Sequence, residues 1–139
     1  MILLDTNVVS ALMLRQPHPA VVGWLDAQDP AEVWLPSVVV FELRFGAASH
    51  PDANRRRLLE DALDRLMDQL IQERVAPLDG HAAQRAAVLA AERKARGRPL
   101  DLRDTLIAGI ALAQEARLAT RNARHFDDTT VVLINPFPS

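Results

Sequence analysis

Three acidic residues, Asp5, Glu42 and Asp104, stand at positions that core packing does not explain. Asp5 directly follows an apolar run, Glu42 lies in a largely apolar helical segment, and Asp104 falls one turn into another predicted helix. Converging carboxylates repel one another unless a cation neutralises them. The chain has no Cys, and its four His show no paired ligand spacing, so hard oxygens are the available ligands. These favour Mg²⁺ or Mn²⁺ over zinc, and such an ion can activate water against a phosphodiester.

Each acid also has a purely structural interpretation. Asp5 can help to cap the helix that follows it, because strand-to-helix turns often carry Asp. Glu42 can be neutralised by Arg44 or by another arginine, since buried acids are usually paired. Asp104 can complement a helix dipole, with Asp101 as the N-cap of the same helix. The sequence leaves these interpretations open beside the metal site.

The elements that must position the acids can be read from hydrophobic patterning. The unbroken apolar run at residues 1–4 predicts a strand buried on both faces, as in a parallel sheet. Asp5 would then lie at the carboxyl end of that strand, where ligands bind in open α/β sheets. Thr6 and Asn7 can cap the following helix. Glu42 lies in a helix that is apolar on nearly every side, which predicts a buried helix.

Helices and short apolar strands alternate along the rest of the chain. The further expected strands are 33–35, 74–76, 117–120 and 130–134, and the expected helices are 8–14, 19–27, 38–48, 52–72, 81–96 and 101–115. Ser37, Asp79 and Asp101 are the expected N-caps of three of these helices. The alternation predicts an α/β fold of three layers, α/β/α, with a short parallel sheet of about five strands. We expect residues 1–139 to form a single domain.

Composition narrows the class of protein. The chain is 49% hydrophobic and 24% charged, which is typical of a globular fold. The absence of Cys is compatible with a reducing cytoplasm, and no apolar run is long enough for a membrane span or resembles a signal peptide. We therefore expect a cytoplasmic protein with no membrane partner. A net charge of -2 provides no global basic field for nucleic acid.

Two phosphoryl-transfer folds that also begin with a strand and an Asp are excluded by other residues. A haloacid-dehalogenase-like phosphatase needs a second Asp two residues after the first, where this chain has Asn7. Both this fold and a phospho-receiver domain need a lysine in the site. The only lysine, Lys94, lies in a run of charged residues typical of a surface.

Four segments, in this order, resemble the four motifs of PIN-domain proteins, and more narrowly the VapC-type toxins of bacterial toxin–antitoxin pairs. They are Ile2-Leu3-Leu4-Asp5-Thr6-Asn7-Val8, Glu42-Leu43-Arg44-Phe45-Gly46, Gly97-Arg98-Pro99 through Asp104-Thr105-Leu106-Ile107-Ala108, and Thr120-Arg121-Asn122 to Phe126. The closing Ile134-Asn135-Pro136-Phe137 resembles the end of FitB-like PIN proteins.

The resemblance implies a Mg²⁺- or Mn²⁺-dependent endoribonuclease, the toxin of a type II toxin–antitoxin system. Asp5, Glu42 and Asp104 match the family's metal-binding, catalytic acids, with Thr6 and Asn7 in supporting positions. Asn122 stands where the family usually has a fourth acid. The implied partners are an RNA substrate, a cognate antitoxin and a second copy in a homodimer, with a larger complex on operator DNA. The alternative is a FitB-like binding subunit of a DNA-bound regulatory complex, with weak or latent nuclease activity.

Arginines flank the third and fourth motifs. Arg98, Arg103, Arg121 and Arg124 are expected to face RNA phosphates at the rim of the acidic pocket, because the arginine fork suits phosphate. They can equally be solvated surface residues. His125 follows in the same turn. We expect its ring to be solvated, but a ring that reached the pocket would favour Mn²⁺.

Overall fold

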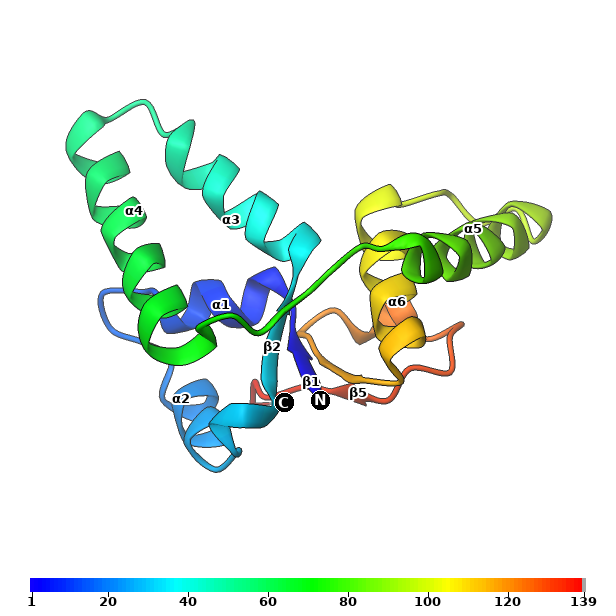
Figure 1. Ribbon diagram of the computed structural model, residues 1–139, viewed down its shortest axis with the longest axis horizontal. Helices are drawn as coiled ribbons and strands as arrows, with labels where there is room; N and C mark the ends of the chain where they lie inside the picture. Colours follow the sequence, from blue (N-terminus) through cyan, green and yellow to red (C-terminus); the bar gives the residue numbers. More distant parts are fainter. Residues whose placement is uncertain (139) are drawn as a thin grey trace.

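Five short parallel strands form the centre of the fold in the computed structural model, which describes residues 1–138 (Figure 1). They are β1 (Ile2–Leu4), β2 (Val33–Pro36), β3 (Val75–Ala76), β4 (Arg117–Ala119) and β5 (Leu133–Ile134). Their order in the sheet is β3-β2-β1-β4-β5, and every pairing is parallel. The three side chains of β1 are buried, as the apolar run predicted.

Helices lie on both sides of this sheet, so the predicted α/β/α fold is confirmed. They are α1 (Thr6–Leu12), α2 (Pro19–Asp26), α3 (Ser37–Ala48), α4 (Ala53–Leu66), α5 (Gly80–Ala95) and α6 (Leu102–Gln114). Three short helical segments are η1 (Pro30–Glu32), η2 (Met67–Ile71) and η3 (Ala123–Phe126). Figure 1 shows the α3–α4 hairpin on one side of the central strands and the α5–α6 pair on the other.

The topology creates a switch point beside β1. The chain runs outward from β1 to β2 and β3, and then returns to the other side of β1 as β4 and β5. In open parallel sheets, the crevice at the carboxyl ends of two such strands is the usual ligand position. Asp5 leaves β1 at this point, and its backbone N–H donates to Ala119 O at the end of β4, 2.9 Å away. Residues after β1 and after β4 therefore meet.

Three helix predictions need correction. The predicted helix 52–72 is α4 followed by the π-helical turn η2, and it ends at Gln72, whose φ is +56°. The expected cap at Ser37 is wrong, because Pro36 is the N-cap and the Ser37 hydroxyl instead accepts from Leu78 N. The helix around Glu42 is not buried all round, since Phe41 is 68% exposed. Apolar patterning alone does not distinguish a core helix from an exposed apolar face.

Close packing of α5 on α6 sets the position of the third acid. Gly109 of α6 has no room for a side chain, because a Cβ there would come within 2.6 Å of Ala82 O and of Ala86 Cβ. Both helices begin with the predicted Asp caps, Asp79 and Asp101, whose carboxylates accept backbone N–H groups of the first turn. The first turn of α6, which carries Asp104, is thus held firmly against the rest of the fold.

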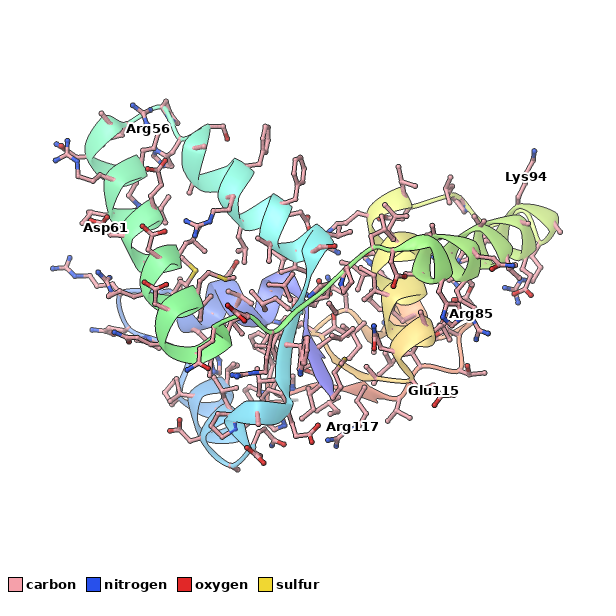
Figure 2. The ribbon with its side chains drawn as sticks, viewed as in Figure 1. Arg56, Asp61, Arg85, Lys94, Glu115 and Arg117 are labelled. Atoms are coloured by element: carbon pink, nitrogen blue, oxygen red, sulfur yellow. The ribbon has the colours of Figure 1, made fainter. Side chains whose placement is uncertain are left out.

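Charged side chains lie on two sides of α5. Lys94 is exposed and points away from the rest of the fold, whereas Arg85, also exposed, lies on the opposite side of the helix (Figure 2) and lines a pocket with Leu112 of α6. Among the helices of residues 1–138, none combines the length and the apolar character that crossing a bilayer requires.

Candidate active site

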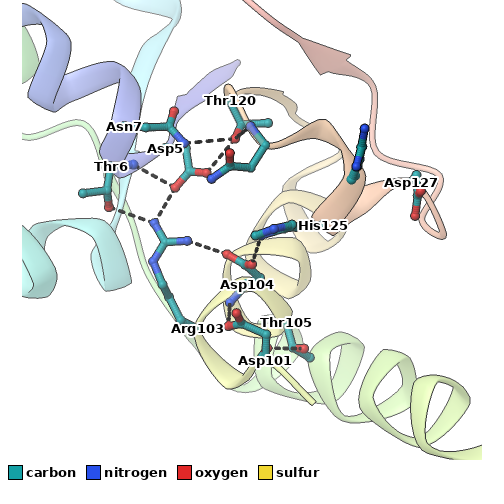
Figure 3. A network of polar contacts seen from close by, with 12 residues as sticks. Asp5, Thr6, Asn7, Asp101, Arg103, Asp104, Thr105, Thr120, His125 and Asp127 are labelled. Atoms are coloured by element: carbon teal, nitrogen blue, oxygen red, sulfur yellow. Dashed lines mark hydrogen bonds and ion pairs between the residues drawn. The ribbon is translucent and has the colours of Figure 1, made fainter. Parts of the chain in front are cut away.

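The structure brings Asp5, Glu42 and Asp104 together around one guanidinium, that of Arg103. Figure 3 shows its contacts with Asp5 and Asp104. Arg103 Nη2 lies 2.5 Å from Asp5 Oδ1, and Nε lies 2.5 Å from Glu42 Oε2. Nη1 donates to Asp104 Oδ1. The acids come from the end of β1, the middle of α3 and the first turn of α6. Elements far apart in the sequence thus supply a single cluster of carboxylates.

The second oxygen of each carboxylate is held by an outer partner. The Thr120 hydroxyl donates to Asp5 Oδ2 at 2.7 Å, and the Thr6 hydroxyl donates to Glu42 Oε1 at 2.9 Å. His125 Nδ1 lies 2.6 Å from Asp104 Oδ2. Each acid therefore turns one oxygen towards Arg103 and has its other oxygen fixed from behind.

Asp5 is the most firmly fixed of the acids. Its side chain has no exposed area, and its Oδ1 also accepts from Thr6 N at 2.7 Å. This last contact caps α1, so Asp5 has the predicted capping role in addition to its place in the acid cluster. Thr6 and Asn7 are not the N-cap, although both contribute to the cluster. Asn7 Oδ1 accepts from Arg121 N at 3.1 Å, which joins the start of α1 to the segment after β4.

Arg103 lies among the carboxylates, not at the rim where the sequence suggested it would face phosphate. Its side chain is 30% exposed. Burial lowers the pKa of Arg103, but the hydrogen bond to Glu42 and the charge of Asp5 outweigh burial, so the pKa rises above its ordinary value. The ion-pair interpretation of Glu42 thus holds with Arg103. Arg44 pairs instead with Asp64, 2.8 Å away.

His125 is not simply solvated, contrary to expectation, because its ring contacts Asp104. Burial raises the pKa of the Asp104 carboxyl above its ordinary value, and the hydrogen bond from His125 opposes that rise. Asp104 N also donates to Asp101 Oδ1 at 3.0 Å, so the predicted capping pair is present as well. The capping role and membership of the acid cluster coexist at Asp104.

A buried ion pair that sequence reasoning missed holds the turn that carries His125. Arg93 of α5 is 2% exposed, and its fork donates to both carboxylate oxygens of Asp128 at 2.8 Å. The same guanidinium donates to His125 O at 2.8 Å and to Thr105 Oγ1 at 3.0 Å. Hydrogen bonding between these two side chains raises the pKa of Arg93 and lowers the pKa of Asp128. Arg93 thereby ties α5, α6 and η3 together.

The remaining candidate residues lie after β4 or beside α6. The Asn122 side chain is exposed and makes no hydrogen bond within residues 1–138, although its backbone N–H donates to Thr120 Oγ1. Arg98 pairs with Asp127 and Asp128, 3.2 Å from each. Arg121 lies over the ring of Phe137, 4.6 Å from its centroid. Arg124 is exposed and contributes its backbone carbonyl to Arg98.

The donor set fits a hard divalent cation. Three carboxylates already surround one positive centre, and each has a hydrogen-bond partner behind it, as metal-ligating carboxylates usually do. Asp5, Glu42 and Asp104 carry more negative charge than Arg103 neutralises. Within residues 1–138, the group of three acidic or histidine side chains whose ligand atoms lie within 4.8 Å of one another is Asp101, Asp104 and His125. The ligand atoms of Asp5, Glu42 and Asp104 are not that close together, because the Arg103 guanidinium lies between them.

A family model, individual relatives and a solved structure each match most of this chain. The PIN domain family model matches residues 2–131. The VapC ribonuclease Y4jK of Sinorhizobium fredii is 36% identical over 137 residues, which are 99% of this chain and 98% of that protein. Toxin FitB of Neisseria gonorrhoeae is 33% identical over 99% of both chains. The solved structure of FitAB bound to an IR36 DNA fragment has a TM-score of 0.87 at 32% identity, with 98% of this chain and 95% of that one covered.

Proposed function

Because this chain belongs to the PIN domain family, we propose that it is a Mg²⁺- or Mn²⁺-dependent endoribonuclease and the toxin of a type II toxin–antitoxin pair. The VapC ribonuclease and the FitB toxin, each similar over nearly the whole chain, support this class. We further propose that residues 1–139 act as one domain, in the cytoplasm, where RNA substrate and antitoxin are available.

The observation that carries the proposal is the arrangement of the carboxylate oxygens. Asp5, Glu42 and Asp104 each direct one oxygen at a common positive centre, while Thr120, Thr6 and His125 restrain the other oxygen. Restrained carboxylates with hard oxygens around a single point are the donor set expected for Mg²⁺ or Mn²⁺.

We assign the residues of the cluster different roles in phosphodiester hydrolysis. A divalent ion, when bound, supplies positive charge that activates water and stabilises the charge developing on phosphate. Asp5 and Asp104, both buried, would hold the ion together with Glu42. The Glu42 side chain is 27% exposed, more than those of the other two acids, so its carboxylate would also orient the attacking water. Thr6 keeps Glu42 in place through its hydroxyl.

The substrate and partners follow from what surrounds the acids. We propose that Arg121 and Arg124, both exposed after β4, contact RNA phosphates, because arginine forks bind phosphate oxygens well. Arg98 can join them at the edge of the same segment. Asn122 stands at the position of the family's fourth acid, and we propose that its amide oxygen contributes to a second ion that binds with substrate. The antitoxin would block the acids by inserting a basic side chain that displaces the metal charge.

A second candidate function is favoured by the likeness to the DNA-bound FitAB structure. In that role the chain is a binding subunit that holds its antitoxin partner on operator DNA, with weak or latent nuclease activity. The antitoxin-free protein distinguishes the two functions. A ribonuclease cleaves RNA when Mg²⁺ or Mn²⁺ is added, whereas a pure binding subunit does not.

The first prediction concerns Asp5→Asn. The change keeps the shape of the side chain but removes the charge that holds the ion, so RNA cleavage in Mg²⁺ or Mn²⁺ should fall at least about 100-fold. Cleavage is measured on a labelled RNA with purified antitoxin-free protein, and circular dichroism checks the fold.

Asp61→Asn is the matched control, because Asp61 is an exposed acid on α4, away from the cluster (Figure 2). It should cleave like the wild type. If Asp5→Asn cleaves RNA as fast as the wild type in Mg²⁺, the catalytic assignment is wrong.

A further inference from the structure

We propose that Arg103 is an internal counter-ion that occupies the metal position in the metal-free protein, so that a divalent ion binds only after the guanidinium has left. The inference rests on the proposed function, because it assumes that Asp5, Glu42 and Asp104 are metal ligands. It adds a regulatory element that is built into the chain itself.

The contacts of Arg103 involve every nitrogen of its guanidinium. Nη2, Nε and Nη1 each bind a different carboxylate, those of Asp5, Glu42 and Asp104, and Nη2 also donates to the Thr6 hydroxyl at 2.9 Å. A surface arginine usually meets one acid in a single, weak ion pair. A side chain that joins three acids from three elements stands in for a cation at their centre.

The guanidinium and the ion need the same oxygens. Asp5 Oδ1, Glu42 Oε2 and Asp104 Oδ1 bind Arg103, while their second oxygens are engaged by Thr120, Thr6 and His125. Mg²⁺ requires its oxygens at about 2.0–2.1 Å, which leaves no space for nitrogen donors between the ion and the carboxylates. Two cations at one point also repel. Binding of the ion and retention of Arg103 are therefore mutually exclusive.

Arg103 has a route from the cluster towards solvent. Its backbone lies in the first turn of α6, which Asp101 caps and which also carries Asp104. Its side chain is 30% exposed and borders a groove that Phe41, Glu42 and Leu106 also line, so rotation about its side-chain bonds can carry the guanidinium towards that groove.

Two measurable effects follow. The apparent metal affinity is reduced by the fraction of molecules whose guanidinium has left, so a departed fraction of about one tenth makes the ion bind about tenfold more weakly. In the metal-free protein, Arg103 offsets repulsion among the acids and so raises the melting temperature. Loss of Arg103 should therefore strengthen metal binding and, at the same time, weaken the metal-free fold.

The test measures Mn²⁺ binding to the metal-free, full-length protein by electron paramagnetic resonance of free Mn²⁺, with no RNA present. Arg103→Met keeps the aliphatic stem and removes the charge, and it should bind Mn²⁺ at least about tenfold more tightly than the wild type. Its melting temperature should be lower without metal and should rise more on addition of Mn²⁺. Arg103→Lys, which keeps a charge but lacks the fork, should bind with intermediate affinity.

Arg44→Met is the matched control. It alters net charge equally, but Arg44 lies on α3 and, within residues 1–138, forms its ion pair with Asp64. Mn²⁺ affinity of this variant should equal that of the wild type. If Arg103→Met and Arg103→Lys both bind Mn²⁺ with wild-type affinity while Asp5→Asn binds none, Arg103 is not a competitor and the inference is overturned. If Asp5→Asn binds Mn²⁺ as well as the wild type does, the metal site itself is wrong and the proposed function fails with it.

Discussion

His125 is the residue that most changes the expected chemistry of the cluster. Its Nδ1 is 2.6 Å from Asp104 Oδ2, so an imidazole stands beside the acids. Imidazole nitrogen suits Mn²⁺ better than Mg²⁺, which prefers oxygen throughout. We predict that His125→Asn reduces the preference for Mn²⁺ over Mg²⁺ several-fold. The measurement is the ratio of the two metal concentrations that give half-maximal RNA cleavage.

Asn122→Asp is the companion variant, because the resemblance assigned the fourth ligand to position 122. The exposed Asn122 side chain makes no hydrogen bond to the acids within residues 1–138. Asn122→Asp would then cleave RNA at a lower metal concentration, while His125→Asn would keep the wild-type ratio of Mn²⁺ to Mg²⁺ concentrations at half-maximal cleavage. This pair of results would make position 122 the metal ligand and would contradict the prediction for His125.

Sequence reasoning identified the acids but not the residues that restrain them. Asp5, Glu42 and Asp104 stood out because a carboxylate in an apolar context needs a partner. Thr120 and Arg93 did not stand out, since threonines and arginines are common on surfaces. Arg103 was predicted to face phosphate at the rim, and its place among the acids was not predicted. Arg93 and Lys94 are adjacent in one charged run, yet Arg93 is buried and Lys94 is exposed. Only the rotation of α5 against its neighbours decides which of them points inward.

At the scale of elements, the buried pair of Arg93 and Asp128 makes η3 a rigid part of the site. The hydrogen bond from Arg93 lowers the pKa of Asp128 below its usual value of 3.8. An acid whose pKa is lower in the folded state stabilises the fold above the unfolded pKa, and this stability is lost as pH falls through the folded value.

We predict that Asp128→Asn lowers the free energy of unfolding at neutral pH by about 3–5 kcal/mol, because it leaves the Arg93 charge buried without a partner. The variant should also lose less additional stability than the wild type when the pH falls below about 4. Urea unfolding at several pH values measures both effects.

Asp64→Asn is the control for this prediction, since Asp64 forms an exposed pair with Arg44. This change should lower the free energy of unfolding by less than about 1 kcal/mol. If Asp64→Asn and Asp128→Asn lower the free energy of unfolding equally, the buried pair does not hold η3 in place.

The order and type of the main elements were predictable from patterning, because short apolar runs and amphipathic stretches alternate clearly. The ends of elements were less predictable. η2 forms where α4 changes to π-helical bonding before Gln72, and nothing in its leucine spacing indicates that change. The polar segment before Phe126 has no apolar periodicity, yet it forms the short 3₁₀ helix η3, whose last residue, Phe126, is buried. Tertiary contacts, not local propensity, fix both segments.

At the scale of the whole molecule, an apolar surface lies exposed on α3. Phe41 and Phe45 are 68% and 62% exposed, and their rings stack with centroids 6.0 Å apart. Exposed apolar patches of this kind usually mark contacts with another protein. Together with the homodimer that the family resemblance implies, this predicts that the purified protein is a dimer.

Sedimentation at micromolar concentrations should give the mass of a dimer, and the double change Phe41→Ser with Phe45→Ser should shift the protein towards the monomer. Val88→Ser on α5 is the control, because Val88 is also an exposed apolar residue but belongs to another face of the fold. A wild-type protein that sediments as a monomer throughout would rule the dimer out.

The acid cluster also has a consequence for the timing of protein synthesis. Asp5 leaves the ribosome early, but the arginine and the threonine that bind it lie 98 and 115 residues later in the chain. At about 5–20 residues per second, a ribosome takes several seconds or more to cover that distance. During this interval the growing polypeptide has a first carboxylate and no assembled cluster. If the proposed nuclease activity needs the assembled cluster, it starts only after β4 and Thr120 have emerged, so the nascent chain does not cut the messenger from which it is being translated.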